Sequence, residues 1–424
     1  MRELHLRGVG PSPRLDAEFG RRLNVFTGDN GLGKTFLLDV LWWVLSTSWA
    51  GQAAWPSQPT DEEHTIEAVV CEDGSVDVAG KYDFQRQRWS RRGLTSGASC
   101  LAIYVRVDGG FAVWDPYRNL SGGLAVPTEV PMSIGSDQRR PRPFLFTPDE
   151  LWDGLADNGK VLCNGLIRDW VTWQRQPGAP FFDSLLEVLD ILSTPEEPIK
   201  AGRPVRVWLD DVRDIPTVHM PYGDVPVTLA SAGMKRVLGL AYLIVWSLWE
   251  HEKAADLIRR RPSDSLVVFM DEAEAHLHPA WQRMLLPALL AAGRSVMPRI
   301  SVQLMATTHS PMVLASLEPI FDKEDDKLFL FDLHEGAARL QQIEWAKQGD
   351  AVGWLTSEVF GLRQARSREA EIAIEAAEAY MRGDVAQLPS HLKTREQIHE
   401  ALLRVLPGHD PFWPRWVVEA KAYR

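Results

Sequence analysis

Three short segments combine residue types that handle phosphates, and each follows an apolar run. The first matches the pattern G-x-x-x-x-G-K-[ST] in full and consists of Gly28, Asp29, Asn30, Gly31, Leu32, Gly33, Lys34 and Thr35. The glycines let backbone N–H groups curl around a phosphate, Lys34 neutralises the outer phosphates, and the Thr35 hydroxyl is a magnesium ligand. A structural glycine turn alone does not explain the adjacent lysine and threonine. The segment is therefore predicted to be a phosphate-binding loop.

The second segment is a pair of carboxylates, Asp271 and Glu272, directly after the apolar run 266–270. Asp271 is expected to hold magnesium, directly or through water. Glu272 projects differently, so it can orient or deprotonate the attacking water while Asp271 stays on the metal. An isolated Asp-Glu pair carries little weight, but here it follows a buried strand and has a phosphate loop upstream. Together the two segments indicate nucleotide hydrolysis.

The third segment places His309 just past the apolar run 300–306, where a ring nitrogen can hydrogen-bond the γ-phosphate or the water. Upstream, Ser231 and Gly233 open the apolar helix predicted over 237–249, and a helix N-terminus favours an anion. The local pattern leaves two interpretations open for Ser231, an ordinary helix N-cap or an anion-binding helix start.

A metal site is the obvious alternative for Glu274, His276 and His278, which resemble a ligand set. Alternate spacing suits one face of a strand, whereas a helix start is predicted at this point, and no further ligand cluster is evident. We therefore interpret these residues as structural.

Composition indicates a globular protein with 45% hydrophobic and 24% charged residues. A formal charge of -11 argues against a uniformly basic surface, so DNA or RNA is not indicated as a ligand. A local basic groove that binds phosphates is the alternative near four arginines, Arg86, Arg88, Arg91 and Arg92. We interpret this segment as the solvated face of a strand.

The three cysteines, Cys71, Cys100 and Cys163, are too few and too scattered for a disulfide framework or a zinc site, which fits a reducing cytosol. The first ten residues do not resemble a secretion signal. The most apolar stretch, 237–249, is too short to cross a bilayer. A cytoplasmic protein without a membrane partner is expected.

Hydrophobic periodicity predicts an α/β fold with a parallel core sheet, because the apolar runs around the three segments suit fully buried parallel strands. β-rich runs between His64 and Trp114 predict an inserted antiparallel sheet, and helical spacing follows over 149–195. The predicted division is an ATPase-type core at 1–50 and 225–362, an antiparallel β subdomain at 51–145, a helical lobe at 146–224, and a helical, aromatic tail at 363–424.

These motifs resemble those of bacterial ABC-class AAA family ATPases, the group that contains the overcoming-lysogenization-defect (OLD) type, Septu and retron-associated ATPases, with SMC-like repair ATPases more distant. The resemblance covers roughly residues 1–45 and 227–365. The phosphate loop matches at 28–35, Asp-Glu-Pro-Glu-x-His-Leu-His-Pro matches at 271–279 with Ala273 replacing proline, and Thr-Thr-His-Ser-Pro matches at 307–311. It also makes Ser231 and Gly233 similar to a degenerate ABC signature.

The resemblance implies a P-loop ABC-type ATPase head that uses ATP and Mg²⁺ and forms a homodimer or higher homo-oligomer, with two ATPs sandwiched at the interface. The preference for ATP over GTP comes from the resemblance alone. The chain departs from the family in two ways: the signature is not the full Leu-Ser-Gly-Gly-Gln, and no lobe-coupling glutamine follows residues 144–146, Gln138 being a poor candidate.

The tail lacks the acidic cluster of a Toprim nuclease, so any effector is expected to be a separately encoded protein. The function predicted first is an ATPase whose ATP-dependent dimerisation controls such an effector in bacterial anti-phage defence. A DNA-repair or SMC-like ATPase that clamps DNA is the alternative, although the acidic total and the absence of long heptad arms count against it. A nucleotide sensor with slow turnover is a third hypothesis.

Overall fold

The computed structural model describes residues 1–57, 63–72, 74–92, 100–119, 143–176, 178 and 180–419. The chain forms two compact units, Met1–Gly349 and Asp350–Arg424. The division therefore falls at 349/350 rather than at the predicted 363, because the short helix after 350 groups with the tail.

The larger unit is organised around an eight-stranded sheet in the order β19-β18-β3-β17-β16-β7-β8-β9. Its strands are β3 (Leu23–Gly28), β7 (Leu101–Val105), β8 (Phe111–Trp114), β9 (Phe144–Phe146), β16 (Ser265–Met270), β17 (Ser301–Thr307), β18 (Asp326–His334) and β19 (Ala337–Ile343). The five central strands, from β18 to β7, run parallel. The apolar runs at 23–26, 266–270 and 300–306 are its buried centre, which confirms the predicted α/β class.

A second, antiparallel sheet has the order β2-β1-β4-β5-β6. Its strands are β1 (Glu3–Val9), β2 (Ser12–Glu18), β4 (Thr65–Glu72), β5 (Gly74–Asp83) and β6 (Arg88–Arg92). The sequence prediction was wrong about the runs at 101–107 and 111–114, which we expected in this antiparallel sheet. They form β7 and β8 of the main sheet, and β7 pairs in parallel with β16. Both strands are buried throughout, as two covered faces require.

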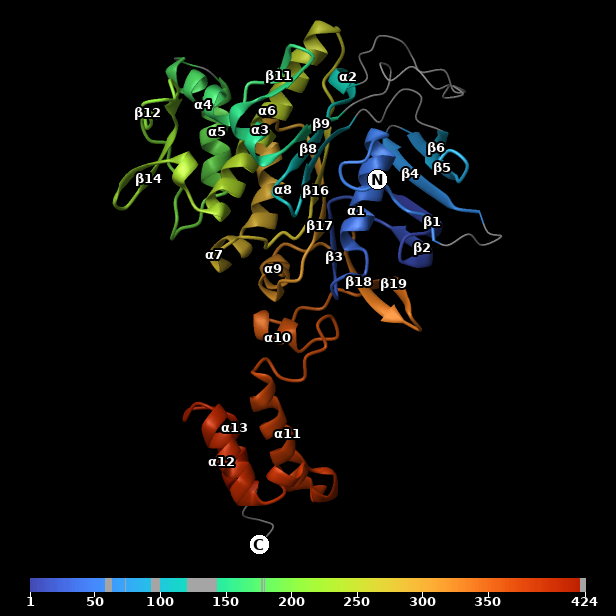
Figure 1. Cartoon of the computed structure of the whole chain (residues 1–424), viewed down its shortest axis with the longest axis vertical. Coiled ribbons are helices and arrows are strands. Elements are labelled where there is room, and N and C mark those ends of the chain that lie inside the picture. Colours follow the sequence, from blue (N-terminus) through green and yellow to red (C-terminus); the bar gives the residue numbers. More distant parts are fainter. Residues whose placement is uncertain are drawn as a thin grey trace. The chain divides into compact units, whose positions relative to one another are not determined.

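Helix α1 (Lys34–Ser46) lies between the two sheets (Figure 1). It starts at the phosphate loop, as predicted, and is apolar on nearly all sides because it faces a sheet on either side. Trp42 packs against Tyr104 of β7 and Phe269 of β16, with ring centroids 5.9 and 6.2 Å apart. The aromatic contacts fix the loop's helix against the strands that carry the carboxylates.

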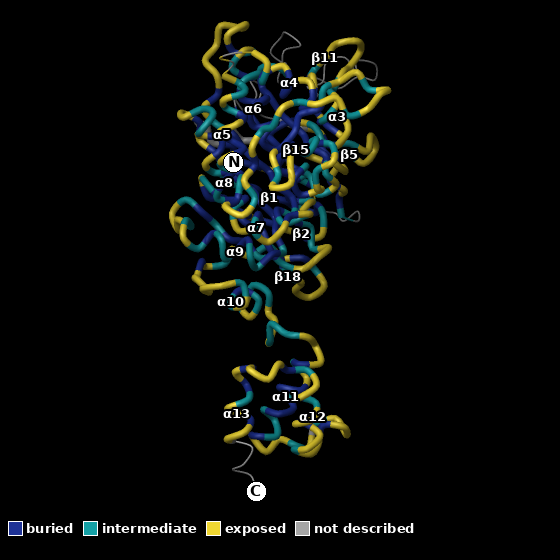
Figure 2. Tube along the Cα trace, turned by 90° about the vertical axis from the view of Figure 1, so that its left-hand side faces the viewer, coloured by how far each residue is buried: buried dark blue, intermediate teal, exposed yellow. Residues whose placement is uncertain are grey.

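The opposite face of the main sheet is covered by α6 and by α8 (Leu285–Val296), and α5 (Pro180–Ile191) packs against these two helices (Figure 1). Helix α6 (Ala232–Leu257) is 26 residues long and includes the predicted apolar stretch 237–249. Figure 2 shows most of it in the buried colour. Among the described residues, no helix combines the length and apolar character needed to span a bilayer.

A lobe of short helices and hairpins packs beside α6. The helices are α2 (Pro116–Asn119), α3 (Pro148–Asp153), α4 (Leu166–Arg175) and α5 (Pro180–Ile191). The hairpin strands are β10 (Leu155–Asp157), β11 (Lys160–Cys163), β12 (Val205–Arg206), β13 (Asp214–Ile215), β14 (Thr217–Met220) and β15 (Gly223–Pro226). The hairpins were not predicted, because most of their residues are exposed and lack a regular apolar alternation.

Three more helices, α7 (Pro279–Gln282), α8 (Leu285–Val296) and α9 (Pro311–Leu317), complete the larger unit. The smaller unit contains α10 (Ala351–Leu355), α11 (Arg368–Arg382), α12 (Arg395–Val405) and α13 (Phe412–Glu419). Its own core gathers Ile374, Ile398, Leu402 and Trp416. Helix α11 ends at Arg382 because Gly383 takes the left-handed conformation that closes a helix.

Candidate functional site

The three predicted segments meet at one edge of the main sheet. β3, β17 and β16 are neighbours and parallel, so their carboxyl ends point the same way. They deliver the phosphate loop, His309 and the Asp271-Glu272 pair into one open cavity of about 240 Å³. Its lining is Asn30, Gly31, Gly33, Lys34, Thr35, Phe36, Asp271, Glu272 and His309. Phe36 is the one lining residue that the sequence did not single out, since an apolar side chain on an apolar helix carries no chemical signal.

The phosphate loop depends on glycine at the points where its backbone turns. Gly28, Gly31 and Gly33 have φ angles of 122, 77 and 100°, which side chains disfavour. A Cβ atom on Gly28 would lie 2.0 Å from the carbonyl oxygen of Phe331. The Lys34 ammonium donates to the carbonyls of Gly28 (2.9 Å) and Asp29 (2.6 Å), and burial lowers its pKa. The cation is thus held across the mouth of the loop.

Asp271, the predicted magnesium ligand, contacts the phosphate loop directly. The Thr35 hydroxyl donates to Asp271 Oδ2 at 2.7 Å, and the Thr307 hydroxyl donates to Asp271 Oδ1 at the same distance. Asp271 is 1% exposed, so both carboxylate oxygens are oriented by protein contacts. A hydroxyl and a carboxylate are hard oxygen donors of the kind that Mg²⁺ prefers, so the residues present fit that ion.

Glu272 is held in a left-handed backbone conformation, with φ of 46°. Its N–H donates to Thr307 Oγ1 at 2.7 Å. Arg236 Nη2 donates to the carbonyl oxygens of Asp271 (2.9 Å) and Glu272 (3.2 Å). The sequence analysis assigned no role to Thr307 or Arg236, although Thr307 opens the matched segment 307–311, because their roles depend on contacts between segments far apart in the chain.

His309 is half-buried, and its loop is fixed by Glu274. The Glu274 carboxylate accepts from the His309 backbone N–H (2.5 Å) and from the Thr308 hydroxyl (2.7 Å). Burial, and then the charge of Lys34, lowers the pKa of His309 below its usual 6.5. The imidazole is therefore uncharged at neutral pH, with a ring nitrogen free to accept or donate one proton.

The other two residues of the rejected metal hypothesis do not join Glu274 at a ligand site. His278 caps α7, where its Nδ1 accepts from the Ala280 N–H at 3.3 Å. In the part of the chain that the structure describes, no group of three or more histidine, cysteine and acidic side chains is arranged to hold a metal ion. The predicted helix start at this point is correct.

Ser231 and Gly233 are absent from the residues that line the cavity. The Ser231 side chain is exposed and caps α6, accepting from the Met234 N–H at 3.2 Å. Gly233 is buried where helix and loop meet, and a Cβ atom there would lie 2.6 Å from the carbonyl oxygen of His276. Ser231 thus caps α6 and is exposed at the start of the helix.

The remaining candidates contribute nothing to this cavity. Arg86 pairs with Asp83 at 2.8 Å on an exposed turn. Cys100 and Cys163 are buried free thiols. Gln138 and the side chains of Arg91 and Arg92 lie outside the described residues.

Comparison with known proteins adds a family match. The family model for an AAA ATPase domain matches residues 213–314, which include α6, β16, β17 and His309. Among solved structures, the SMC head domain from Thermotoga maritima is similar over 81% of this chain and 100% of that chain, with 17% identity and a TM-score of 0.40. The SMC head bound to the C-winged helix domain of ScpA covers 81% and 97%, with 14% identity and a TM-score of 0.43. The recombination mediator RecF with ATPγS covers 81% and 98%, with 11% identity and a TM-score of 0.39.

The family match and the cavity support the same assignment. The match includes Asp271, Glu272 and His309, and the phosphate loop faces these residues across the cavity. Together they support an ATPase domain with a phosphate-binding loop.

Proposed function

We propose that this protein hydrolyses ATP as a dimer in which each subunit completes the nucleotide site of the other. One observation carries the proposal: the cavity holds the phosphate loop, both acids and His309, whereas Ser231 and Gly233 are not part of its lining. Ser231 is exposed at the start of α6, where N–H groups and the helix dipole favour an anion. A second copy can therefore present this helix start to the phosphates.

The roles of the residues follow from their contacts. Thr35 and Asp271 would hold Mg²⁺, which neutralises charge on the phosphates. Lys34 exchanges its loop carbonyls for phosphate oxygens. Glu272 orients and deprotonates the attacking water, and the uncharged His309 hydrogen-bonds the water or the γ-phosphate.

The output of the cycle is the dimer itself. ATP bound between two subunits stabilises the closed state by its differential affinity for that state, and hydrolysis releases it. We propose that this change controls a separately encoded effector in bacterial anti-phage defence. The insert at residues 50–200 and the tail at residues 365–424 are the proposed docking surfaces. This part rests on the resemblance of the motifs to the ABC-class group described above.

The test is light scattering of the purified protein with ATP, ADP or GTP and Mg²⁺, together with phosphate release. Glu272→Gln should form a stable ATP-dependent dimer, because it binds ATP without activating water. Lys34→Ala should neither bind nucleotide nor dimerise. Lys323→Ala removes an exposed lysine far from the cavity in sequence and should behave as wild type.

The outcomes separate the hypotheses. An assembly that never responds to nucleotide would contradict the dimer proposal. ATP-dependent dimers that bind duplex DNA in a salt-sensitive manner would replace effector control with a DNA clamp. Dimers that form but release phosphate as slowly as Glu272→Gln would identify a nucleotide sensor.

A further inference from the structure

Arg236 links the first turns of α6 to the backbone that carries Glu272. Its Nη2 contacts the carbonyl oxygens of both Asp271 and Glu272. We propose that Arg236 is a positioning residue, which holds Glu272 in its catalytic conformation and makes hydrolysis in one subunit depend on the α6 start of that same subunit. The inference rests on the proposed dimer function and adds a direction of coupling to it.

The backbone at Glu272 needs to be held. A glutamate with φ of 46° occupies a region that side chains disfavour, and such conformations persist where surrounding contacts over-determine them. Thr307 holds the N–H of Glu272, and Arg236 holds the carbonyls on both sides of its Cα. The peptide after Glu272 is also held by two backbone contacts, from the Ala273 N–H to the Thr307 carbonyl (3.0 Å) and from the Ala275 N–H to the Glu272 carbonyl (2.9 Å). Arg236 adds a side-chain contact on each side of the Glu272 Cα, and its loss lets the carboxylate shift within the cavity.

Arg236 is poorly suited to a purely stabilising role. It is 8% exposed, and its Nε and Nη1 atoms have no hydrogen-bond partner among the described residues. A buried guanidinium with unsatisfied donors weakens a fold, and an apolar residue of the same size is the more stable choice at such a site. The side chain therefore contributes through its hydrogen bonds to the Asp271 and Glu272 carbonyls.

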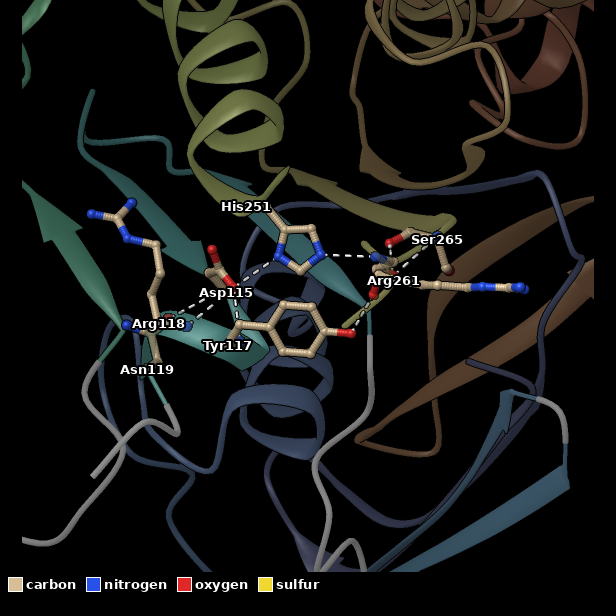
Figure 3. Close-up of polar contacts among 8 residues, drawn as sticks. Asp115, Tyr117, Arg118, Asn119, His251, Arg261 and Ser265 are labelled. Carbon is tan, nitrogen blue, oxygen red and sulfur yellow. Dashed lines mark hydrogen bonds and ion pairs between the residues drawn. The ribbon is translucent and has the colours of Figure 1, made fainter. Parts of the chain in front are cut away.

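Helix α6 contacts the segment after β16 at its start and the segment before β16 near its end, so a displacement of the helix reaches both segments. At its start, Gly233 allows the helix to approach the His276 carbonyl more closely than any side chain would permit. Near its end, the fully buried His251 accepts from the Ser263 N–H (2.8 Å), and its other ring nitrogen donates to Asp115 (2.9 Å). Figure 3 shows this ring between Asp115 and the backbone that leads into β16.

The coupling has a direction. In the proposed dimer, the α6 start of one subunit contacts the ATP held by its partner's phosphate loop. Arg236 passes the position of that helix to Glu272 of its own subunit. Each ATP is therefore sensed by the catalytic glutamate that acts on the other ATP, and the two hydrolysis events are coupled.

Mixed dimers test this directly, with two affinity tags used to isolate heterodimers. In the first, one subunit carries Arg236→Met and its partner carries Glu272→Gln, so the single working site has the altered arginine beside its own Glu272. In the second, one subunit carries both substitutions and its partner is wild type, so the altered arginine faces the working ATP from across the interface. A dimer of wild type with Glu272→Gln is the reference.

We expect the first dimer to lose kcat by about tenfold or more with little change in KM, because misplacing a catalytic group affects the chemical step. The second should match the reference. Arg236→Lys should restore part of the rate, since one ammonium can still reach a carbonyl. Lys253→Met, which removes an exposed cation from the same helix, should leave kcat unchanged.

Other patterns overturn the inference. A loss in the second dimer alone would make Arg236 part of the partner's nucleotide site, and equal losses in both would indicate general damage to α6. If neither mixed dimer lost kcat, Glu272 would be positioned without the help of Arg236. Failure of wild type to dimerise with ATP would instead remove the dimer proposal, and the light-scattering signal distinguishes that case.

Discussion

Thr307 Oγ1 lies 2.7 Å from Asp271 Oδ1 and donates to it across the tops of two adjacent strands. The same oxygen accepts from the N–H of Glu272 at 2.7 Å. One hydroxyl thus orients the proposed metal ligand and the proposed general base together. The arrangement is possible because parallel β16 and β17 place residues 271 and 307 side by side.

Thr307→Val should lower kcat by about 10- to 100-fold, because the isosteric methyl group leaves the Glu272 N–H and one Asp271 oxygen without their partner. ATP binding by the phosphate loop should change little. Thr307→Ser keeps the hydroxyl and serves as the matched control. Steady-state phosphate release and nucleotide titration measure the two effects, and a Val variant with wild-type kcat would contradict the role assigned to Thr307.

Glu274→Ala should weaken the fold around His309 and slow hydrolysis. The substitution leaves the Thr308 hydroxyl and the His309 N–H without an acceptor, which costs about 1–3 kcal/mol for each group that stays buried. Glu274→Gln retains one carbonyl oxygen and should show a smaller loss of kcat. Thermal unfolding and phosphate release give the two readouts. If removal of zinc by a chelator reproduced the defect in wild type, the metal-site interpretation would return.

The sequence predicted the parts of the site that local chemistry marks. The phosphate loop, the Asp271-Glu272 pair and His309 could be assigned because each follows a continuous apolar strand, and strand ends of a parallel sheet meet at one edge. Arg236 and Thr307 could not, since the contact of α6 with the segment that follows β16 and the pairing of β17 with β16 are properties of the tertiary structure.

The fold shows the same limit. Strands β7 and β8 are short continuous apolar runs, whereas β4 to β6 contain charged residues, and the prediction grouped all five runs because they follow one another between short turns. Their complete burial distinguishes them, because every residue of both strands is covered. The continuous apolar character of β7 and β8 is the local signal of this burial, and the strand that each one pairs with is set by the tertiary structure.

Tyr242→Phe should destabilise the junction between α6 and the helical lobe by about 1–3 kcal/mol. The buried Tyr242 hydroxyl donates to Asp169 Oδ2 at 2.8 Å and lies 3.0 Å from Cys163 Sγ. Its loss leaves the Asp169 carboxylate with one partner fewer, the Asn164 amide remaining at 2.8 Å. Tyr222→Phe, at a side chain that is 78% exposed, is the control.

Cys163 provides an independent readout of that junction. Burial raises the pKa of its thiol to about 11, so the native thiol should resist alkylation at pH 8, where the reactive thiolate is scarce. Opening of the lobe in Tyr242→Phe should speed the labelling of Cys163. Equal labelling rates in the two proteins, with equal thermal stability, would show that the Tyr242 hydroxyl does not hold the junction.

Asp39 should make the stability of the larger unit depend on pH in an unusual direction. Burial raises the pKa of this carboxyl from 3.8 to about 6, although a hydrogen bond with Tyr104 and the charge of Arg106 act against the shift. The folded state then binds the proton more tightly than the unfolded state, so this contribution to stability is fully present below pH 4 and is lost as the pH rises to about 6.

A shift of about two pKa units corresponds to roughly 3 kcal/mol, so Asp39→Asn should raise stability above pH 6 by up to that amount and flatten the profile between pH 4 and 6. Thermal unfolding midpoints of wild type, Asp39→Asn and the exposed control Asp190→Asn across pH 4–8 measure it. Parallel profiles for all three proteins would mean that Asp39 ionises as freely in the folded chain as in the unfolded one.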